Sequence, residues 1–434
     1  MMKRILLTLF SMYEIANRQD KLFKKWLHKI EEKPCEIRFH LFLGLSHIDL
    51  TGESLSKKLM SEVFKFVLFD KWLKANGNHA TLTNEFLKSV DSKDFYEFFS
   101  KVFQMNSVAV NEHIISREIY PELWVVLDYF SRSVPKGTEW NELGDLRKKP
   151  LYQLKNGNYL ILDFGFILDK FFSGIYHDLV GMASANKSNF HLDYSKEFVE
   201  EALLVNSLKA TFGKSYLQFS EKRMKANGKK VENLAMPDYY IRNGNKVMIF
   251  ECKNSFLSQK NKVSLDCDLI ETEIMQKFVE NSGKRKAVRQ LSNFISNASN
   301  GKYLYFDNVK KLSNIVYYPI LVVTDSTLTS IGFNKLFNEY FDKDLIEKDP
   351  GLKKRIKPLT IIHINDFLYY NVYLKKLDAE INNYNDFLQK QNVIDRMISF
   401  STYLHVERLL GKKSLNRNNL NAILRDSFLS EEKK

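Results

Sequence analysis

Residues 236–253 have the sequence MPDYYIRNGNKVMIFECK, in which an Asn-Gly pair separates two largely apolar segments. An Asn-Gly pair in this setting is a strong signal for a β-hairpin with a two-residue turn. We place that turn at Asn243 and Gly244. The continuous apolar run at residues 247–250 then predicts a second strand that is buried on both of its faces.

Three polar side chains fall on one face of the predicted hairpin. In this register Asp238 lies opposite Ile249, and Glu251 is one diagonal step away. Because side chains alternate between the two faces of a strand, Asp238, Glu251 and Lys253 share a face, whereas Cys252 points to the other. A three-residue turn would put Asp238 and Glu251 on opposite faces, so the prediction depends on the length of the turn.

These residue types suit the hydrolysis of a phosphodiester. Two neighbouring carboxylates can share a Mg²⁺ ion, which prefers oxygen ligands, keeps several waters and takes phosphate oxygens as further ligands. A nearby ammonium can position the attacking water and stabilise charge on a phosphate. The alternative is that Asp238 and Glu251 are ordinary solvated hairpin residues. Charged residues at the end of a buried strand are costly without a function, which favours the functional interpretation.

The spacing of these residues resembles the motif of the PD-(D/E)xK nuclease superfamily. Pro237 and Asp238 are followed by twelve residues, which end in a hydrophobic strand, and then by Glu251, Cys252 and Lys253. The resemblance implies an αβββαβ core and Mg²⁺- or Mn²⁺-dependent hydrolysis of DNA, less often of RNA. It also implies that Asp238 and Glu251 are metal ligands and that Lys253 is the catalytic lysine.

Many members of that superfamily carry a further acidic ligand on the first helix of the core. Glu197, Glu200 and Glu201 are the candidates in this chain. On a helical wheel Glu201 falls within the apolar stripe that contains Phe198 and Val205, whereas Glu200 points away. We therefore predict that Glu201 faces the sheet and is the third metal ligand. A charge at the rim of the sheet is the alternative.

A later helix carries the candidates for nucleic-acid binding. Gln290 and Phe294 resemble the Gln-xxx-Tyr element of nucleases related to the recombination helicase-nuclease group, with Phe in place of Tyr. Lys284, Lys286 and Arg289 surround Gln290, as a surface that contacts phosphates requires. An ordinary solvated helix face is the alternative for all four residues.

A second basic run, at residues 222–230, precedes the hairpin. It either flanks a nucleic-acid groove or is only a loop. Before it, Ser195 can cap a helix that runs through Phe212, with Gly213 just beyond its end. Further strands are expected near residues 216–219, 316–324 and 359–364, and further helices over residues 268–280 and 284–297.

The predicted fold class is α/β, because helices alternate with strands around the hairpin. We expect a small mixed central sheet with an αβββαβ nuclease core, preceded by a mostly helical N-terminal domain and followed by C-terminal helices. The expected domains are a mostly helical region over residues 1–185 with a β-hairpin near 151–162, a nuclease domain over 190–410 and a polar basic tail over 411–434.

The composition bounds the class of protein. The 434 residues carry a formal charge of +13 and are 44% hydrophobic, which excludes a largely disordered chain. Three cysteines are too few for a disulfide framework and indicate a reducing compartment, so we expect a cytoplasmic protein. The apolar runs are too short to span a membrane. The excess of Lys and Arg indicates polyanionic partners, with an A+T-rich genome as the alternative explanation.

These observations together predict a metal-dependent nuclease, with DNA favoured over RNA as substrate and Mg²⁺ or Mn²⁺ as cofactor. The architecture looks like those of bacterial restriction, repair or anti-phage nucleases, which is an association with the fold class. The alternative is a non-catalytic or partner-activated nucleic-acid-binding module on a nuclease fold. A protein partner or a homo-oligomer is compatible with both hypotheses.

Overall fold

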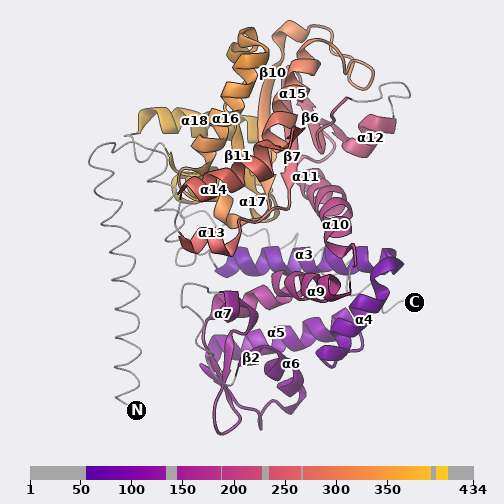
Figure 1. Ribbon diagram of the computed structural model, residues 1–434, viewed down its shortest axis with the longest axis vertical. Coiled ribbons are helices and arrows are strands. Elements are labelled where there is room, and N and C mark those ends of the chain that lie inside the picture. Colours follow the sequence, from indigo (N-terminus) through magenta and orange to yellow (C-terminus); the bar gives the residue numbers. More distant parts are fainter. Residues whose placement is uncertain are drawn as a thin grey trace.

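A computed structural model of the chain is shown in Figure 1. It describes residues 55–132, 144–186, 188–226, 234–264, 267–391 and 397–408. The expected basic tail over residues 411–434 and the first part of the N-terminal domain lie outside these residues. The described chain is mixed α/β, as the sequence predicts, with helices around two larger sheets. None of its helices has the length and apolar character needed to cross a membrane.

The larger sheet has five strands in the order β11-β10-β7-β6-β5. Neighbours from β5 to β7 are antiparallel, whereas β7, β10 and β11 are parallel to one another. The sheet is therefore mixed, and its parallel strands are buried along almost their whole length. The strands are β5 (Leu217–Ser220), β6 (Tyr239–Asn243), β7 (Lys246–Lys253), β10 (Val316–Val323) and β11 (Thr360–His363).

The hairpin between β6 and β7 turns one residue later than predicted. Asn243 pairs with Lys246, so the two turn residues are Gly244 and Asn245. Gly244 has a φ of +61° and Asn245 has no left-handed φ, which is the pattern of a type II′ turn with Gly in the first central position. The later turn moves every residue of β6 by two positions along β7. An even shift leaves each side chain on its predicted face.

One helical run covers the first face of the large sheet. It consists of α10 (Phe190–Asp193), the π-helical segment η4 (Tyr194–Leu204) and α11 (Val205–Phe212). The run begins before Ser195, so the prediction that Ser195 caps it is wrong. The prediction that Gly213 lies just beyond its end is confirmed, because Gly213 follows α11 with a φ of +60°.

The second face of the sheet is covered by helices that follow β7 and β10. They pack on an apolar cluster that includes Tyr240, Val247, Ile249, Leu291 and Phe337. The helices expected over residues 268–280 and 284–297 are present here, and the strand expected near 316–324 is β10. The covering elements are α14 (Cys267–Ile274), the π-helical segment η5 (Met275–Val279), α15 (Ala287–Ser299) and α16 (Phe333–Lys348).

The described part of the N-terminal region is mostly helical, as predicted, and the hairpin expected near residues 151–162 is present. That hairpin belongs to a four-stranded sheet with the order β1-β4-β3-β2. Its strands are β1 (Ile114–Ile115), β2 (Ser131–Arg132), β3 (Leu151–Gln153) and β4 (Tyr159–Ile161). The helices are α3 (Leu55–Ala75), α4 (Ala80–Ser89), α5 (Phe95–Asn111), α6 (Trp124–Tyr129), α7 (Gly144–Lys148), α8 (Phe164–Leu168) and α9 (Ser173–Ala185).

Helix α3 lies between the N-terminal helices and the large sheet (Figure 1). The ring of Phe69 on α3 is 5.3 Å from that of Phe198 on η4. Both rings belong to one apolar cluster that continues to Phe250 in the centre of β7. The domain boundary expected between residues 185 and 190 stays a prediction, but the core runs without a break across it.

The remaining elements connect these layers. Helices α17 and α19, whose bounds follow, pack against β11, and the small hairpin of β8 and β9 precedes α15. These elements are α12 (Glu221–Ala226), α13 (Gln259–Ser264), β8 (Glu280–Asn281), β9 (Lys284–Arg285), α17 (Ile364–Tyr369), α18 (Leu377–Lys390) and α19 (Phe400–Tyr403).

Candidate active site

The structure brings Asp238, Glu251 and Lys253 together at one end of the hairpin. Asp238 immediately precedes β6, and its Oδ2 accepts a hydrogen bond from the backbone N–H of Cys252 at 2.6 Å. Lys253 ends β7, and its Nζ lies 2.8 Å from Oε1 of Glu251. Because Tyr239 pairs with Phe250, Asp238 comes opposite Glu251 and not opposite Ile249 as predicted. The two carboxylates are therefore closer neighbours than the sequence indicates.

Glu251 is a deeply buried member of this group. Its residue is only 2% exposed, and its Oε2 is buried without a hydrogen-bond partner among the described residues. A buried carboxylate oxygen without a partner is costly, because folding removes its water and returns nothing. Such an atom has an open coordination position that a donor or a cation can fill.

The third carboxylate beside this pair is Glu200 and not Glu201. Glu201 is exposed to solvent, so the prediction that it faces the sheet is wrong. Glu200 is half-buried, and burial together with the charge of Asp238 raises its pKa to about 8. The physical reason is the π-helical segment η4, in which buried positions recur after five residues, as from Phe198 to Leu203. A wheel of 3.6 residues per turn therefore exchanges the positions of Glu200 and Glu201, although it places Phe198 correctly in the core.

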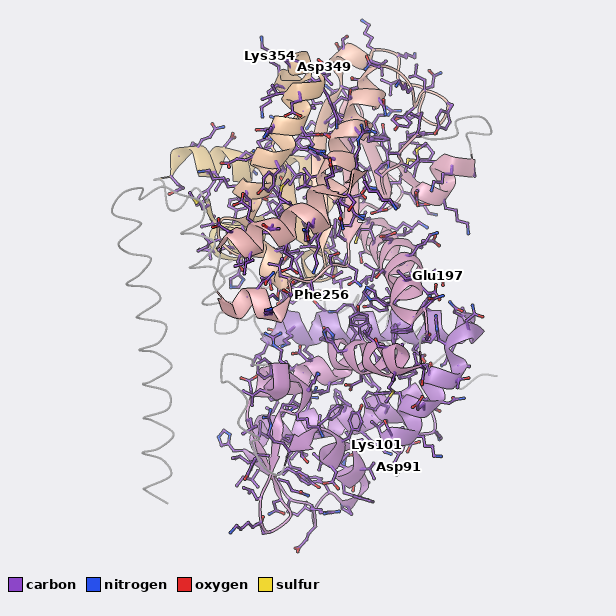
Figure 2. All side chains as sticks on the ribbon, in the orientation of Figure 1. Asp91, Lys101, Glu197, Phe256, Asp349 and Lys354 are labelled. Atoms are coloured by element: carbon purple, nitrogen blue, oxygen red, sulfur yellow. The ribbon has the colours of Figure 1, made fainter. Side chains whose placement is uncertain are left out.

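The other acidic candidate on this helix, Glu197, is hydrogen-bonded to α3 and to the loop that follows it. Glu197 accepts hydrogen bonds at Oε2 from Nδ2 of Asn76 at 2.7 Å and from Nε1 of Trp72 at 3.4 Å. Figure 2 labels Glu197 at the level where the N-terminal helices meet the sheet-containing part. Glu197 therefore ties η4 to α3 and its neighbouring loop.

The charged groups of the site change one another's pKa values. Burial and then the negative charge of Asp238 raise the pKa of Glu251 to about 8. Burial also raises the pKa of Asp238, although Lys253 and the N–H of Cys252 oppose this. Burial alone would lower the pKa of Lys253, but the charges of Glu251 and Asp238 outweigh burial and raise it. Lys253 is therefore a cation at neutral pH, and the carboxylates lack enough positive charge for all of them to ionise.

The donor set fits a hard divalent cation. No group of three or more His, Cys, Asp or Glu in the described residues could hold a metal ion as it stands. Mg²⁺ does not need such a group, because it is commonly bound by one or two carboxylates and completes its shell with water and phosphate oxygens. Asp238 and the open Oε2 of Glu251 provide those carboxylates, and an added cation would relieve the repulsion that raises their pKa values.

Asn254 fixes the end of β7 and was not predicted from the sequence. Its Nδ2 donates to Oγ of Ser195 on η4 at 3.0 Å, and its Oδ1 accepts from Thr324 after β10 at 2.8 Å. The same Nδ2 lies 3.4 Å from the hydroxyl of Tyr176 on α9. Asn254 thus joins the strand that carries Lys253 to the helix that carries Glu200. A single Asn after a strand gives no sequence signal for such a role.

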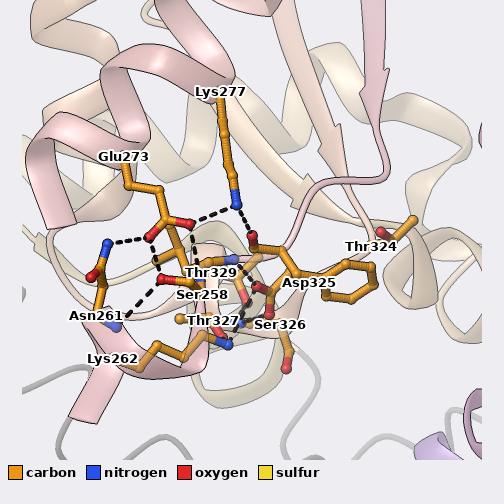
Figure 3. A network of polar contacts seen from close by, with 12 residues as sticks. Ser258, Asn261, Lys262, Glu273, Lys277, Thr324, Asp325, Ser326, Thr327 and Thr329 are labelled. Carbon is orange, nitrogen blue, oxygen red and sulfur yellow. Dashed lines mark hydrogen bonds and ion pairs between the residues drawn. The ribbon is translucent and has the colours of Figure 1, made fainter. Parts of the chain in front are cut away.

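A second polar network holds the segment that follows Asn254 (Figure 3). Glu273 on α14 accepts from the N–H of Ser258 at 2.8 Å and from Lys277 at 2.6 Å. Asp325 accepts from the N–H of Leu257 at 3.1 Å and lies 3.5 Å from Nζ of Lys262. Although burial raises the pKa of Glu273, its hydrogen bonds outweigh burial and lower it. These carboxylates are satisfied by partners, and their role is therefore structural.

The segment held by this network also contacts the N-terminal helices. Phe256, which Figure 2 labels beside α3, has its ring 6.2 Å from that of Tyr176 and 5.8 Å from that of His177. Lys277 donates to the carbonyl of Phe256 at 2.6 Å. The chain after Lys253 is therefore packed between α9 and η5.

The predicted nucleic-acid residues lie around the start of α15 in different settings. Lys284 is exposed on β9, and Lys286 immediately precedes the helix. Arg289 pairs with Glu280 and lies 3.3 Å from Asp344, so its charge is already compensated. Of the three predicted cations, Lys284 and Lys286 form no ion pair with any residue in the described part of the chain, so they remain candidates for contacting phosphates.

Gln290 lies on the side of α15 that faces the sheet. Its Oε1 is buried without a hydrogen-bond partner among the described residues. One turn later, the ring of Phe294 is 6.3 Å from that of Tyr240, and Ala298 lines a cavity together with Val247. The later turns of α15 thus lie beside the beginning of β7, which places Gln290 toward the end that carries Glu251.

The second basic run is described only in part. Residues 222–226 form most of α12, where Lys225 pairs with Glu221 at 2.5 Å. Arg223 lies over the ring of Phe219 at 5.1 Å. Lys229 and Lys230 lie outside the described residues.

Comparison with known proteins identifies no relative of this chain. No family model matches the sequence, no curated protein matches it, and no solved structure matches the chain. What the site does is therefore inferred from its own residues.

Proposed function

We propose that the chain is a divalent-metal-dependent nuclease whose active site consists of Asp238, Glu251, Lys253 and Glu200. The observation that carries this proposal is the buried carboxylate of Glu251, in which Oε1 contacts Lys253 and Oε2 has no hydrogen-bond partner among the residues that the structure describes. Purely structural carboxylates of the same domain, such as Glu273, have all their oxygens satisfied.

The order of the elements supports the proposal. A helix (η4 and α11) precedes the antiparallel strands β5, β6 and β7, which are followed by α15 and by β10 parallel to β7. This order resembles the αβββαβ order of PD-(D/E)xK nucleases when the short helix α12 between β5 and β6 and the elements α13 to β9 between β7 and α15 are treated as insertions, with β11 as an added fifth strand. The site also lies at the strand ends where the resemblance puts the acidic residues.

Asp238 and Glu251 would hold a Mg²⁺ or Mn²⁺ ion, with Glu200 adding negative charge beside them. A divalent cation bound there would stabilise the charge that develops on a phosphodiester during hydrolysis. Lys253 is held protonated by the carboxylates, so it serves as a donor to a phosphate oxygen and not as a general base at neutral pH. Asn254 keeps Lys253 in register with Glu200 through Ser195.

The substrate is nucleic acid, because the chemistry is that of a phosphodiester and the chain is strongly basic. We propose DNA ahead of RNA on the resemblance alone. Lys284, Lys286 and Gln290 extend from the site along the start of α15 and would contact the substrate. A cytoplasmic role in bacterial restriction, repair or anti-phage defence fits such an enzyme.

The test uses the purified full chain with duplex DNA, single-stranded DNA and RNA, each with Mn²⁺, Mg²⁺ or EDTA. We expect metal-dependent cleavage of at least one substrate. Glu251→Gln and Lys253→Met should each lower the rate by about 100-fold or more, since each removes a charge at the reacting phosphate. Circular dichroism should show that both variants are folded, and Glu201→Gln serves as a matched control that keeps the wild-type rate.

The alternative, a non-catalytic binding module on the same fold, gives a different result. Such a module would show salt-sensitive binding of nucleic acid without turnover under every metal condition. Cleavage that persists at the wild-type rate in Glu251→Gln would contradict the assignment of the site, even if the chain is a nuclease.

A further inference from the structure

A basic groove lies beside the proposed active site, between the end of α11 and the strand β5. Its volume is about 360 Å³. Because β5 is at the edge of the sheet, the groove lies along the border of the domain. The lining residues that matter here are Lys209, Lys214, Gln218, Ser220, Arg223 and Tyr239.

All charged side chains that line the groove are cations. Lys209, Lys214 and Arg223 are exposed, and within the described part of the chain none of them forms an ion pair. No carboxylate is among the lining residues. By contrast, Lys225 on the same short helix as Arg223 is paired with Glu221. Unpaired cations in a concave surface attract a polyanion.

Hydrogen bonds fix the shape of the groove before any ligand binds. Gly213 has a φ of +60°, which lets the chain turn sharply from α11 towards β5. Gln218 donates from Nε2 to the carbonyl of Gly213 and accepts at Oε1 from the hydroxyl of Tyr239 at 3.1 Å. The helix end, β5 and β6 are thus already joined, so binding a ligand requires little further ordering.

The groove ends where the carboxylate site begins. Ser220 pairs with Tyr239, and the next residue, Glu221, donates its N–H to the carbonyl of Asp238 at 3.0 Å. Tyr239 and the groove lie on the face of the sheet that α11 covers, whereas Glu251 projects from the other face, because side chains alternate along a strand. The groove and the carboxylate site therefore meet at the end of β5, where the backbones of residues 220–221 and 238–239 are joined. A chain of phosphates that rounds this end of the sheet would contact both.

We infer that this groove binds the sugar-phosphate backbone of the nucleic-acid strand next to the phosphate that is cleaved. The inference rests on the proposed function for the position of the cleaved phosphate, and on the charge of the groove for the binding itself. Lys209 and Lys214 contact phosphates as point charges, without reading the sequence of bases.

The double variant Lys209→Gln/Lys214→Gln tests this. Binding of labelled single-stranded DNA, duplex DNA and RNA is measured by fluorescence anisotropy in EDTA, as a function of NaCl concentration. The slope of log affinity against log salt should fall by about 1.4 to 1.8, since each lost phosphate contact removes about 0.7 to 0.9. In Mn²⁺, KM should rise several-fold while kcat stays unchanged.

The control variant is Lys354→Gln/Lys390→Gln, which removes the same charge from exposed lysines on other elements. Lys354 lies at the far end of the sheet-containing part (Figure 2). The salt slope and the KM of this control variant should equal those of the wild type. If the groove variant behaves like this control while the wild type cleaves, the groove is not the binding surface, although the proposed function stands.

Two other outcomes separate the claims. Wild type that binds without cleaving, with weaker binding in the groove variant alone, supports the groove and contradicts the nuclease. Wild type that neither binds nor cleaves contradicts both.

Discussion

Glu200 and Glu201 are adjacent and chemically identical but lie in different surroundings. The same substitution at each of them therefore separates the effect of position from the effect of residue type. Glu200 is half-buried beside Asp238, and Glu201 is exposed. We expect Glu200→Gln to lower kcat/KM for metal-dependent cleavage by about 10- to 100-fold, the loss typical of a group that supports a metal site. Glu201→Gln should be unchanged. A larger effect at Glu201 would mean that η4 is an ordinary α-helix.

The raised pKa values of the carboxylates predict how stability depends on pH. The pKa of Glu251 rises from an ordinary 4.5 to about 8 on folding, so between these values the folded state holds a proton that the unfolded state has released. The free energy of unfolding of the metal-free protein should therefore fall as pH rises from about 4.5 to about 8. Urea titrations across this range in EDTA measure it, and Glu251→Gln should flatten the dependence.

The same shifts predict that metal binding strengthens with pH. Ligands must lose their protons to bind a cation, so Mn²⁺ should raise the melting temperature more at pH 8 than at pH 6. A metal effect that is independent of pH would mean that neither Glu200 nor Glu251 is protonated in the free protein.

At the scale of the element, the type II′ turn between β6 and β7 sets the register of the site. Gly244 has a φ of +61°, while a Cβ at this position would meet no atom within 4 Å. Gly244→Ala should therefore destabilise the protein by about 1 kcal/mol through backbone strain alone. Gly77→Ala is the control, since Gly77 is equally open and has no left-handed φ. Equal urea midpoints for the two variants would contradict the turn type.

The hairpin and the helical segment show what the sequence can and cannot predict. The two-residue turn was recognisable from Asn-Gly, and an error of one position in its placement did no harm, because Asp238 and Glu251 kept their common face. The acidic residue predicted as a third metal ligand was misplaced, because a wheel of 3.6 residues per turn was applied to a π-helical segment in which buried positions recur after five residues. Asn254 was missed because its partners Ser195 and Thr324 are distant in sequence.

At the scale of the whole molecule, a buried ion pair joins the N-terminal helices to the sheet. Nζ of Lys57 on α3 lies 2.7 Å from Asp366 on α17, whose side chain is fully buried. Lys57→Met leaves that carboxylate without its cation and should destabilise the protein by about 3–5 kcal/mol. Lys74→Met, on the same helix, removes an exposed partner of Asp70 and should cost below about 1 kcal/mol.

The response of the rest of the molecule to Lys57→Met is informative as well. The apolar core is continuous from α3 to β7, so both parts should unfold in a single transition at lower urea concentration. Two separate transitions, one for the N-terminal helices and one for the sheet, would instead support the domain boundary expected between residues 185 and 190.

The proposed function requires that the carboxylates at the end of the hairpin bind a divalent cation. A crystal structure of the protein with Mn²⁺, with anomalous diffraction data, would locate that cation. We expect an anomalous peak between Asp238 and Oε2 of Glu251, and no such peak in Glu251→Gln. An empty position there, at a Mn²⁺ concentration that supports cleavage, would contradict metal binding by these carboxylates.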